Sequence, residues 1–261
     1  MTISNYTCKV DLSFNKGEII ISRKQLKFEI KQLFKGNWID AIKIAIIPII
    51  FTILGFMIEG RNSISQVPSH NSATLEYSSL DLPSILSSLS IGILIILIAG
   101  LVFSVISDLF VQSANYSYLT WIREGNISGS TSKNIFRAWS KKYRNGVVRI
   151  SAMIYIYTFL WSLLLIIPGI IKFFSYSQAF FVYKDQLNKS IKENTPKPTI
   201  NGAISKSREL MKGHKWEYFV LSLSFIGWSI LAGITLGIGF IWLVPYTKGT
   251  FVNYYNHLVT D

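Results

Sequence analysis

The chain of 261 residues has little charge and almost no cysteine. Charged residues make up 15% of its positions, whereas apolar residues make up 50%. This balance is too apolar for a soluble domain of this size and is typical of a protein that crosses the membrane several times. The single cysteine, Cys8, excludes an internal disulfide framework. We interpret it as an inert thiol.

The sequence also lacks the motifs that carry most enzyme chemistry. It has no glycine-rich phosphate loop, no nucleophile elbow and no paired carboxylates within its apolar runs. The three histidines, His70, His214 and His257, lie on different segments without the spacing of metal ligands. We therefore predict that the protein is not an enzyme and has no catalytic residue, metal or cofactor.

The net charge of +12 is distributed in blocks, and this argues against nucleic acid as a partner. Of the 26 Lys and Arg residues, 8 lie in residues 1–43, 7 in 112–149 and 8 in 184–217. The long loop 59–84, between the first two apolar runs, carries Arg61 and three acids. Loops kept in the cytoplasm accumulate Lys and Arg, so we expect both chain ends in the cytoplasm and this loop outside.

The apolar runs predict an all-α polytopic membrane protein that forms one domain over residues 1–261. A crossing helix needs about 20 apolar residues. By this measure the chain contains six spans in three hairpins after a cytoplasmic leader (1–38), namely 39–58, 85–111, 147–167, 168–184, 216–236 and 238–257. The second run exceeds one crossing, so we expect it to tilt or to continue as a helix as far as Trp121.

A basic amphipathic stretch followed by glycine precedes each hairpin, at 23–35, 135–145 and 200–212. The helical period places apolar residues on one face of each stretch and cations around the rest. Such helices can lie at the headgroup level with their cations toward anionic lipid, or their apolar faces can pack against the bundle. The glycines Gly36, Gly146 and Gly213 are predicted elbows between helix and span.

Span five carries Ser229, Gly233 and Gly237 at intervals of four residues. Small residues on one face allow a second helix to approach closely. We therefore interpret these three residues as a packing face and this span as an interior helix of the bundle.

Two ionisable residues within the apolar runs, Asp108 and Lys248, are candidate functional groups. A charge at the middle of the bilayer costs on the order of 3 kcal/mol on insertion scales. Pairing of the two residues would explain why both are tolerated. The alternative is that Lys248 extends to the interface and Asp108 lies among the headgroups.

Nearly the whole chain resembles a known family of integral membrane proteins, catalogued as domain of unknown function nine-seven-five and found mainly in Gram-positive bacteria, and the C-terminal signature is specific. The residues that carry the resemblance are Ser207, Arg208, Met211, Lys212, Gly213, His214, Gly227, Trp228, Pro245 and Tyr246. That family is distantly similar to membrane domains attached to some glycerophosphodiester phosphodiesterases. The resemblance implies a bacterial cytoplasmic membrane protein and assigns no activity.

These observations favour a non-enzymatic membrane protein with an accessory, scaffold or envelope-protective role. Its expected partners are membrane lipids, with anionic headgroups at the basic helices, and another membrane protein. The alternative function is a small transporter or channel for a lipid, peptide or other solute, with a cavity lined by Ser, Tyr and Lys248.

Overall fold

The computed structural model describes residues 22–64, 82–127, 129–164 and 166–260, and every regular element in these ranges is a helix. The predicted all-α class is confirmed for this part of the chain. Cys8, His70 and most of the predicted outer loop 59–84 lie outside it. The helices are α1 (Arg23–Phe34), α2 (Trp38–Ile44), α3 (Ile46–Ile64), α4 (Leu82–Glu124), α5 (Thr131–Ile135), η1 (Arg137–Trp139), α6 (Arg144–Leu164), α7 (Ile166–Tyr176), α8 (Ala179–Lys192), α9 (Ile200–Leu210), α10 (Lys215–Ile234) and α11 (Phe240–Thr260).

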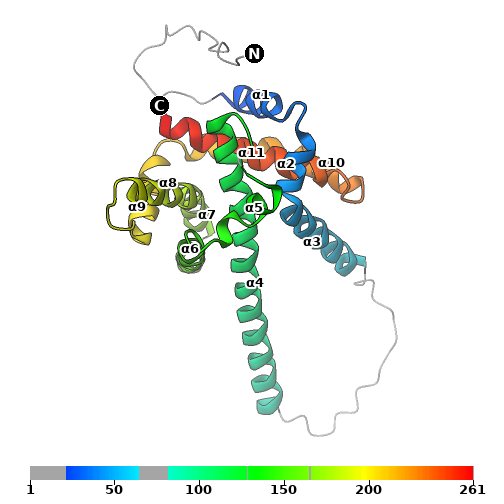
Figure 1. Cartoon of the computed structure of the whole chain (residues 1–261). Coiled ribbons are helices and arrows are strands. Elements are labelled where there is room, and N and C mark those ends of the chain that lie inside the picture. Colours follow the sequence, from blue (N-terminus) through cyan, green and yellow to red (C-terminus); the bar gives the residue numbers. More distant parts are fainter. Residues whose placement is uncertain (1–21, 65–81, 128, 165, 261) are drawn as a thin grey trace, which may run out of the picture.

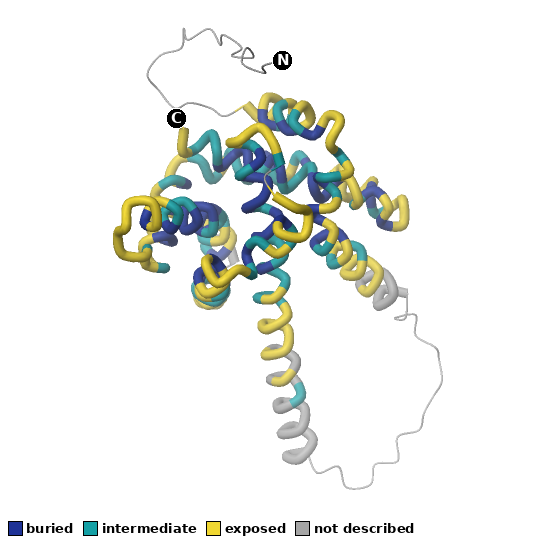
Figure 2. The backbone as a smooth tube through the Cα atoms, in the orientation of Figure 1, coloured by how far each residue is buried: buried dark blue, intermediate teal, exposed yellow. Residues whose placement is uncertain are grey.

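Helix α4 is the longest of the described helices (Figure 1). It extends from an exposed region into the core. Its 43 residues extend about 65 Å at 1.5 Å per residue, about twice the hydrocarbon thickness of a bilayer. Of the two expectations for this run, the helix that continues as far as Trp121 is observed, and it ends three residues later at Glu124. The C-terminal half of α4 is buried in the core, whereas Ile98 and Phe103 earlier in the helix are exposed (Figure 2).

Three of the described helices are long and apolar enough to cross a membrane. They are Ile98–Glu124, Arg144–Leu163 and Lys215–Ile234. A fourth candidate is the pair Trp38–Ile44 and Ile46–Ile58, which is bent by 70° at its break. These helices are consistent with a membrane protein, and the predicted span 39–58 corresponds to the bent pair.

The predicted span 168–184 is divided between two helices. Helix α7 ends at Tyr176 and α8 begins at Ala179. The Ser177 hydroxyl donates to the carbonyl of Phe174, and the Gln178 amide donates to Ser177. Such local side-chain bonds compete with the helical backbone pattern, which explains the break.

The helices do not run parallel to one another. Figure 1 shows α4 running down the picture and α11 running across it, while α6 is viewed along its axis. The core lies where the C-terminal half of α4 meets the other helices (Figure 2). The tertiary structure thus gathers both long and short helices around one end of α4.

The first amphipathic helix, α1, packs its apolar face against the bundle. Leu26, Ile30 and Phe34 are fully or almost fully buried. The approach is close because Gly249 of α11 has no side chain, and a Cβ there would lie 3.0 Å from Ile30 Cγ2 and Phe34 Cζ. Of the two alternatives for this face, packing against the helices is the one observed.

Polar contacts fasten α1 in place. The Glu29 carboxylate accepts hydrogen bonds from Asn253 (2.7 Å), His257 (2.8 Å) and Gln25 (2.9 Å). Burial alone raises the pKa of Glu29, but these bonds outweigh burial and bring the pKa to about 2. The carboxylate is therefore ionised at neutral pH. The Lys27 ammonium lies 2.8 Å from Ser224 Oγ and 4.2 Å from the centre of the Phe225 ring.

The second amphipathic stretch, 135–145, differs from the predicted helix, because it is divided among the last residue of α5, the 3₁₀ turn η1 and the first residues of α6. Its backbone is held by side chains of the buried half of α4. Ser117 donates to the carbonyl of Asn134, and the amide of Ala138 donates to Ser113 Oγ. These bonds replace helical backbone bonds and seat the segment on α4. The third stretch forms the helix α9 as expected, with Thr199 accepting a capping bond from the Gly202 amide.

The three predicted elbow glycines have different roles. Gly36 (φ +84°) and Gly213 (φ +91°) lie between helices in the left-handed region, where glycine is favoured. The structure differs at Gly146, which lies within the first turn of α6 rather than at a bend. There the Tyr183 ring lies directly against the glycine, in the space that a Cβ would occupy. Gly146 thus allows close packing and is not an elbow.

The predicted packing face on span five is not a face of one helix. Helix α10 ends at Ile234, so Gly237 (φ +86°) lies in the turn to α11. Gly233 does serve close packing, since a Cβ there would lie 3.1 Å from the Phe56 ring of α3. The Ser229 hydroxyl donates to the Phe225 carbonyl of its own helix.

Helix α10 lies at the edge of the bundle rather than in its interior, contrary to the prediction. The side chains of Ile230 and Ile234 are exposed, as are both members of the edge-to-face pair Trp228 and Trp242. A helix with so much apolar exposure is suited to a lipid environment.

Candidate functional site

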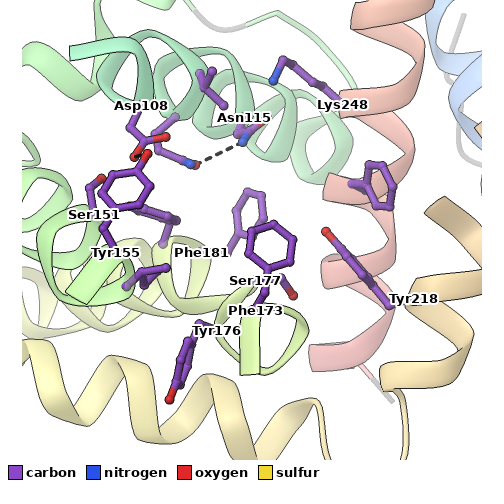
Figure 3. A pocket seen from close by; sticks show the side chains of 15 residues that line it. Asp108, Asn115, Ser151, Tyr155, Phe173, Tyr176, Ser177, Phe181, Tyr218 and Lys248 are labelled. Carbon is purple, nitrogen blue, oxygen red and sulfur yellow. Dashed lines mark hydrogen bonds between the residues drawn. The ribbon is translucent and has the colours of Figure 1, made fainter. Parts of the chain in front are cut away.

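The best candidate site is a cavity of about 380 Å³ among the helices (Figure 3). Six helices contribute to it: α4, α6, α7, α8, α10 and α11. Its walls are mainly aromatic and aliphatic, with a few polar groups. The lining residues are Asp108, Val111, Gln112, Asn115, Ser151, Ile154, Tyr155, Phe173, Tyr176, Ser177, Phe180, Phe181, Tyr218, Lys248 and Phe251.

The cavity brings together the two ionisable residues that the sequence identified. Asp108 projects from α4 and accepts a hydrogen bond from Tyr155 of α6 at 2.8 Å. Lys248 enters the same cavity from α11 (Figure 3). The two charges attract each other, but among the described residues no ion pair within 4.0 Å joins them. The structure therefore places the pair in one site without direct contact.

Other polar groups of the cavity are partly paired with each other. The Asn115 amide donates to Gln112 Oε1 at 3.1 Å (Figure 3). The remaining wall is aromatic, with Phe173 and Phe181 on one side and Tyr218 on another (Figure 3). A concave apolar site with a few polar groups is typical of a small-molecule site. This composition suits a ligand that has both an apolar part and a polar group.

The described residues show no group of three or more metal-ligating side chains. The Asp108 carboxylate accepts its hydrogen bond from the hydroxyl of Tyr155. This contact is not the pairing of a nucleophile with an activating base.

Sequence analysis missed the buried cation Lys184, which is only 4% exposed. Its ammonium donates to the carbonyl of Tyr116 at 2.8 Å and to Thr120 Oγ1 at 3.1 Å. Arg137 donates to the same hydroxyl oxygen at 2.7 Å. In the sequence, Lys184 ends an apolar run and is the first residue of the basic block 184–217. The sequence analysis therefore counted it among the cations expected in the cytoplasm. Only the packing of α8 against α4 shows that it is enclosed.

A second network that the sequence did not reveal joins α4, α8 and α11. Arg123 forms a two-bond ion pair with Asp185, at 2.8 and 2.9 Å. The Tyr255 hydroxyl donates to the same carboxylate at 2.8 Å, and Asn256 accepts from Arg123 at 3.1 Å. A bidentate pair of this kind fixes geometry as well as charge. The network ties the three helices together.

Some of the C-terminal residues that carry the family resemblance serve packing, whereas Arg208, Lys212, Gly213, Gly227 and Trp228 are exposed. Ser207 of α9 donates to the carbonyl of Ser175 in α7 at 2.9 Å. Tyr254 of α11 donates to the carbonyl of His214, whose ring lies 3.1 Å from Glu217. Met211 is fully buried, and Pro245 lies inside α11. These residues hold α7, α9, α10 and α11 together.

Comparison with known proteins supports the resemblance and adds no activity. The family model described as "Protein of unknown function (DUF975)" matches residues 82–261. No curated protein and no solved structure matches the chain. The distant similarity to membrane domains of glycerophosphodiester phosphodiesterases is therefore not shown.

Proposed function

Because the chain belongs to the DUF975 family, whose members have no assigned function, we propose a function from the geometry of the chain itself. We propose that it is a non-enzymatic protein of the bacterial cytoplasmic membrane that binds an amphiphilic ligand, a lipid or a peptide, in the cavity between its helices. Such binding would serve an accessory, scaffold or envelope-protective role. The observation that carries this proposal is an aromatic cavity with Asp108 and Lys248 in its wall.

The proposed topology is six crossings with both chain ends in the cytoplasm. The three candidate spans and the bent pair supply part of this number, and the apolar runs supply the rest. In this arrangement the long helix α4 crosses the membrane and continues into the cytoplasm. Helices α7 and α8 share the fourth crossing.

The orientation gives a direct prediction. A fluorescent protein that matures only in the cytoplasm should be bright when fused after Asp261, and alkaline phosphatase at the same place should be inactive. The reason is that the basic blocks hold these ends on the inner side. A dark fluorescent fusion together with an active phosphatase would reverse the proposed orientation. Equal expression of the two fusions on an immunoblot is the control.

The cavity gives a second prediction. Protein purified from native membranes should carry a lipid or peptide that mass spectrometry detects, and Lys248→Met should reduce its amount by about tenfold. The lysine supplies the positive charge of the cavity, and the loss of one charge-assisted hydrogen bond in an enclosed site has about this effect. Asp108→Asn should change which ligand is retained, because it removes the one acid among the described residues that line the cavity.

The matched control for this experiment is Lys189→Met. Lys189 lies on α8 outside the cavity, and its side chain is 72% exposed. This variant should retain the ligand of the unmodified protein. Equal ligand contents in Lys248→Met and Lys189→Met, with both proteins folded by gel filtration, would contradict the cavity proposal.

A small transporter or channel is the second candidate function. The same cavity favours it, since Ser151, Ser177 and the tyrosines of the wall could accompany Lys248 in a solute path. Reconstitution in liposomes separates the two functions. Movement of the copurified ligand across the bilayer by the protein alone would favour transport over an accessory role.

A further inference from the structure

A second pocket, of about 510 Å³, lies apart from the cavity. It is formed by the segment before α6, the first two turns of α6, Tyr183 of α8 and the start of α9. Four cations line it, namely Lys141, Lys142, Arg149 and Lys197. None of its lining residues is acidic. The pocket thus gathers positive charge from two regions that are about 50 residues apart in the sequence.

These four cations share one pocket that has no acid in its lining, whereas three other lysines of the described chain have acidic partners. Lys43, Lys189 and Lys206 each lie within 4.0 Å of an acid three or four residues away. In the described part of the chain, no acid pairs with any of the four cations of the pocket, and Lys142 contacts only the ring of Tyr143. Like charges that face one space repel each other unless an anion lies between them. An anion bound in the pocket would relieve this repulsion among its four cations.

The backbone at the pocket adds to this positive character. Asn145 and Gly146 belong to the first turn of α6, and their amide groups have no acceptor within the helix. The positive end of the dipole of a 21-residue helix lies at the same place. Gly146 allows the Tyr183 ring to close one side of the pocket, because any side chain there would occupy the position of the ring.

We propose that this pocket binds a phosphate group, carried either by a lipid headgroup or by a soluble phosphorylated compound. A phosphate presents several oxygens that can each accept a charge-assisted hydrogen bond, and the pocket is lined by cations from α6, from the segment before it and from the segment before α9. The pocket belongs to two of the three basic blocks, so in the proposed topology it opens at the cytoplasmic headgroup level. The proposal does not depend on the ligand of the cavity.

The test uses the full chain in detergent with the double variant R149Q/K197Q. Inorganic phosphate, added at constant ionic strength against chloride, should raise the thermal unfolding temperature of the unmodified protein. The double variant should need about tenfold more phosphate for the same rise, since it loses two charged donors. In a second arm, native mass spectrometry should show phosphatidylglycerol retained from mixed vesicles in preference to phosphatidylcholine, and less of it on the double variant.

The matched control is K189Q/K206Q, which removes the same charge from two exposed lysines that already have acidic partners. It should behave as the unmodified protein in both arms, and R149K should retain binding. A response to phosphate alone identifies a soluble ligand, and retention of phosphatidylglycerol alone identifies a lipid headgroup. Identical behaviour of the two double variants in both arms, with both folded by gel filtration, would overturn the proposal. Ligand loss from the cavity in the Lys248→Met variant leaves this outcome unaffected.

Discussion

Replacement of Phe34 by alanine is expected to release α1 from the bundle and to destabilise the protein by about 3–5 kcal/mol. The Phe34 ring is fully buried. Its centre lies 5.1 Å from the ring of Trp121, 5.3 Å from that of Trp38 and 5.6 Å from that of Tyr118. The substitution removes all three aromatic contacts and leaves a cavity at the point where α1, α2 and α4 meet.

Limited trypsin digestion measures this release, because α1 contains several lysines that are protected only while the helix is docked. Phe34→Ala should be cut within α1 far faster than the unmodified protein, and its thermal unfolding temperature should fall. The control is Phe28→Ala on the same helix, whose ring is 60% exposed and whose removal should change stability by at most about 0.5 kcal/mol. Equal cleavage of the two variants would show that α1 does not depend on the Phe34 contacts.

Replacement of Gly239 by alanine is expected to have the second large effect. A Cβ at this position would lie 2.7 Å from the Cα of Ala232 and 2.8 Å from its Cβ. Because one of these atoms belongs to the backbone of α10, relief of the clash requires the two helices to move apart. Overpacking of this kind costs about 1–3 kcal/mol. The shift would also strain the bond from the Gly239 amide to Thr235 Oγ1, which is 3.0 Å long.

The matched control is Gly227→Ala, in the middle of α10. No atom lies within 4 Å of a Cβ at Gly227, and alanine favours the helix by about 1 kcal/mol relative to glycine. Thermal unfolding in detergent should therefore show a lower transition temperature for Gly239→Ala and an unchanged or higher one for Gly227→Ala. A Gly239→Ala protein as stable as the control would mean that the α10–α11 turn adapts without loss.

These predictions show how far the sequence alone reaches. The helical class, the continuation of α4 as far as Trp121 and the family could be read from run lengths and local motifs. The pattern of small residues in span five identified Gly233 but not Gly239. A Cβ at Gly239 would lie closer to its neighbours than a Cβ at Gly233. A pattern on one helix identifies small residues, but it does not show which of them another helix approaches.

The residues of the candidate site were also only partly predictable from the sequence. Asp108 and Lys248 could be selected because charge is rare within apolar runs, yet the other walls of their cavity come from four further helices. Lys184 was passed over because it stands at the start of the basic block 184–217, although its neighbours in space enclose it. Burial depends on contacts that no local window contains.

The sequence by itself determined the apolar runs, the basic blocks and the family, because each is a property of residues adjacent along the chain. The tertiary structure decided which polar groups meet. Asp185 pairs with Arg123 across 62 residues, and Glu29 accepts from Asn253 across 224. Such pairs form only when helices have packed, since the geometry of a hydrogen bond requires about 3 Å between atoms that the chain keeps far apart in sequence.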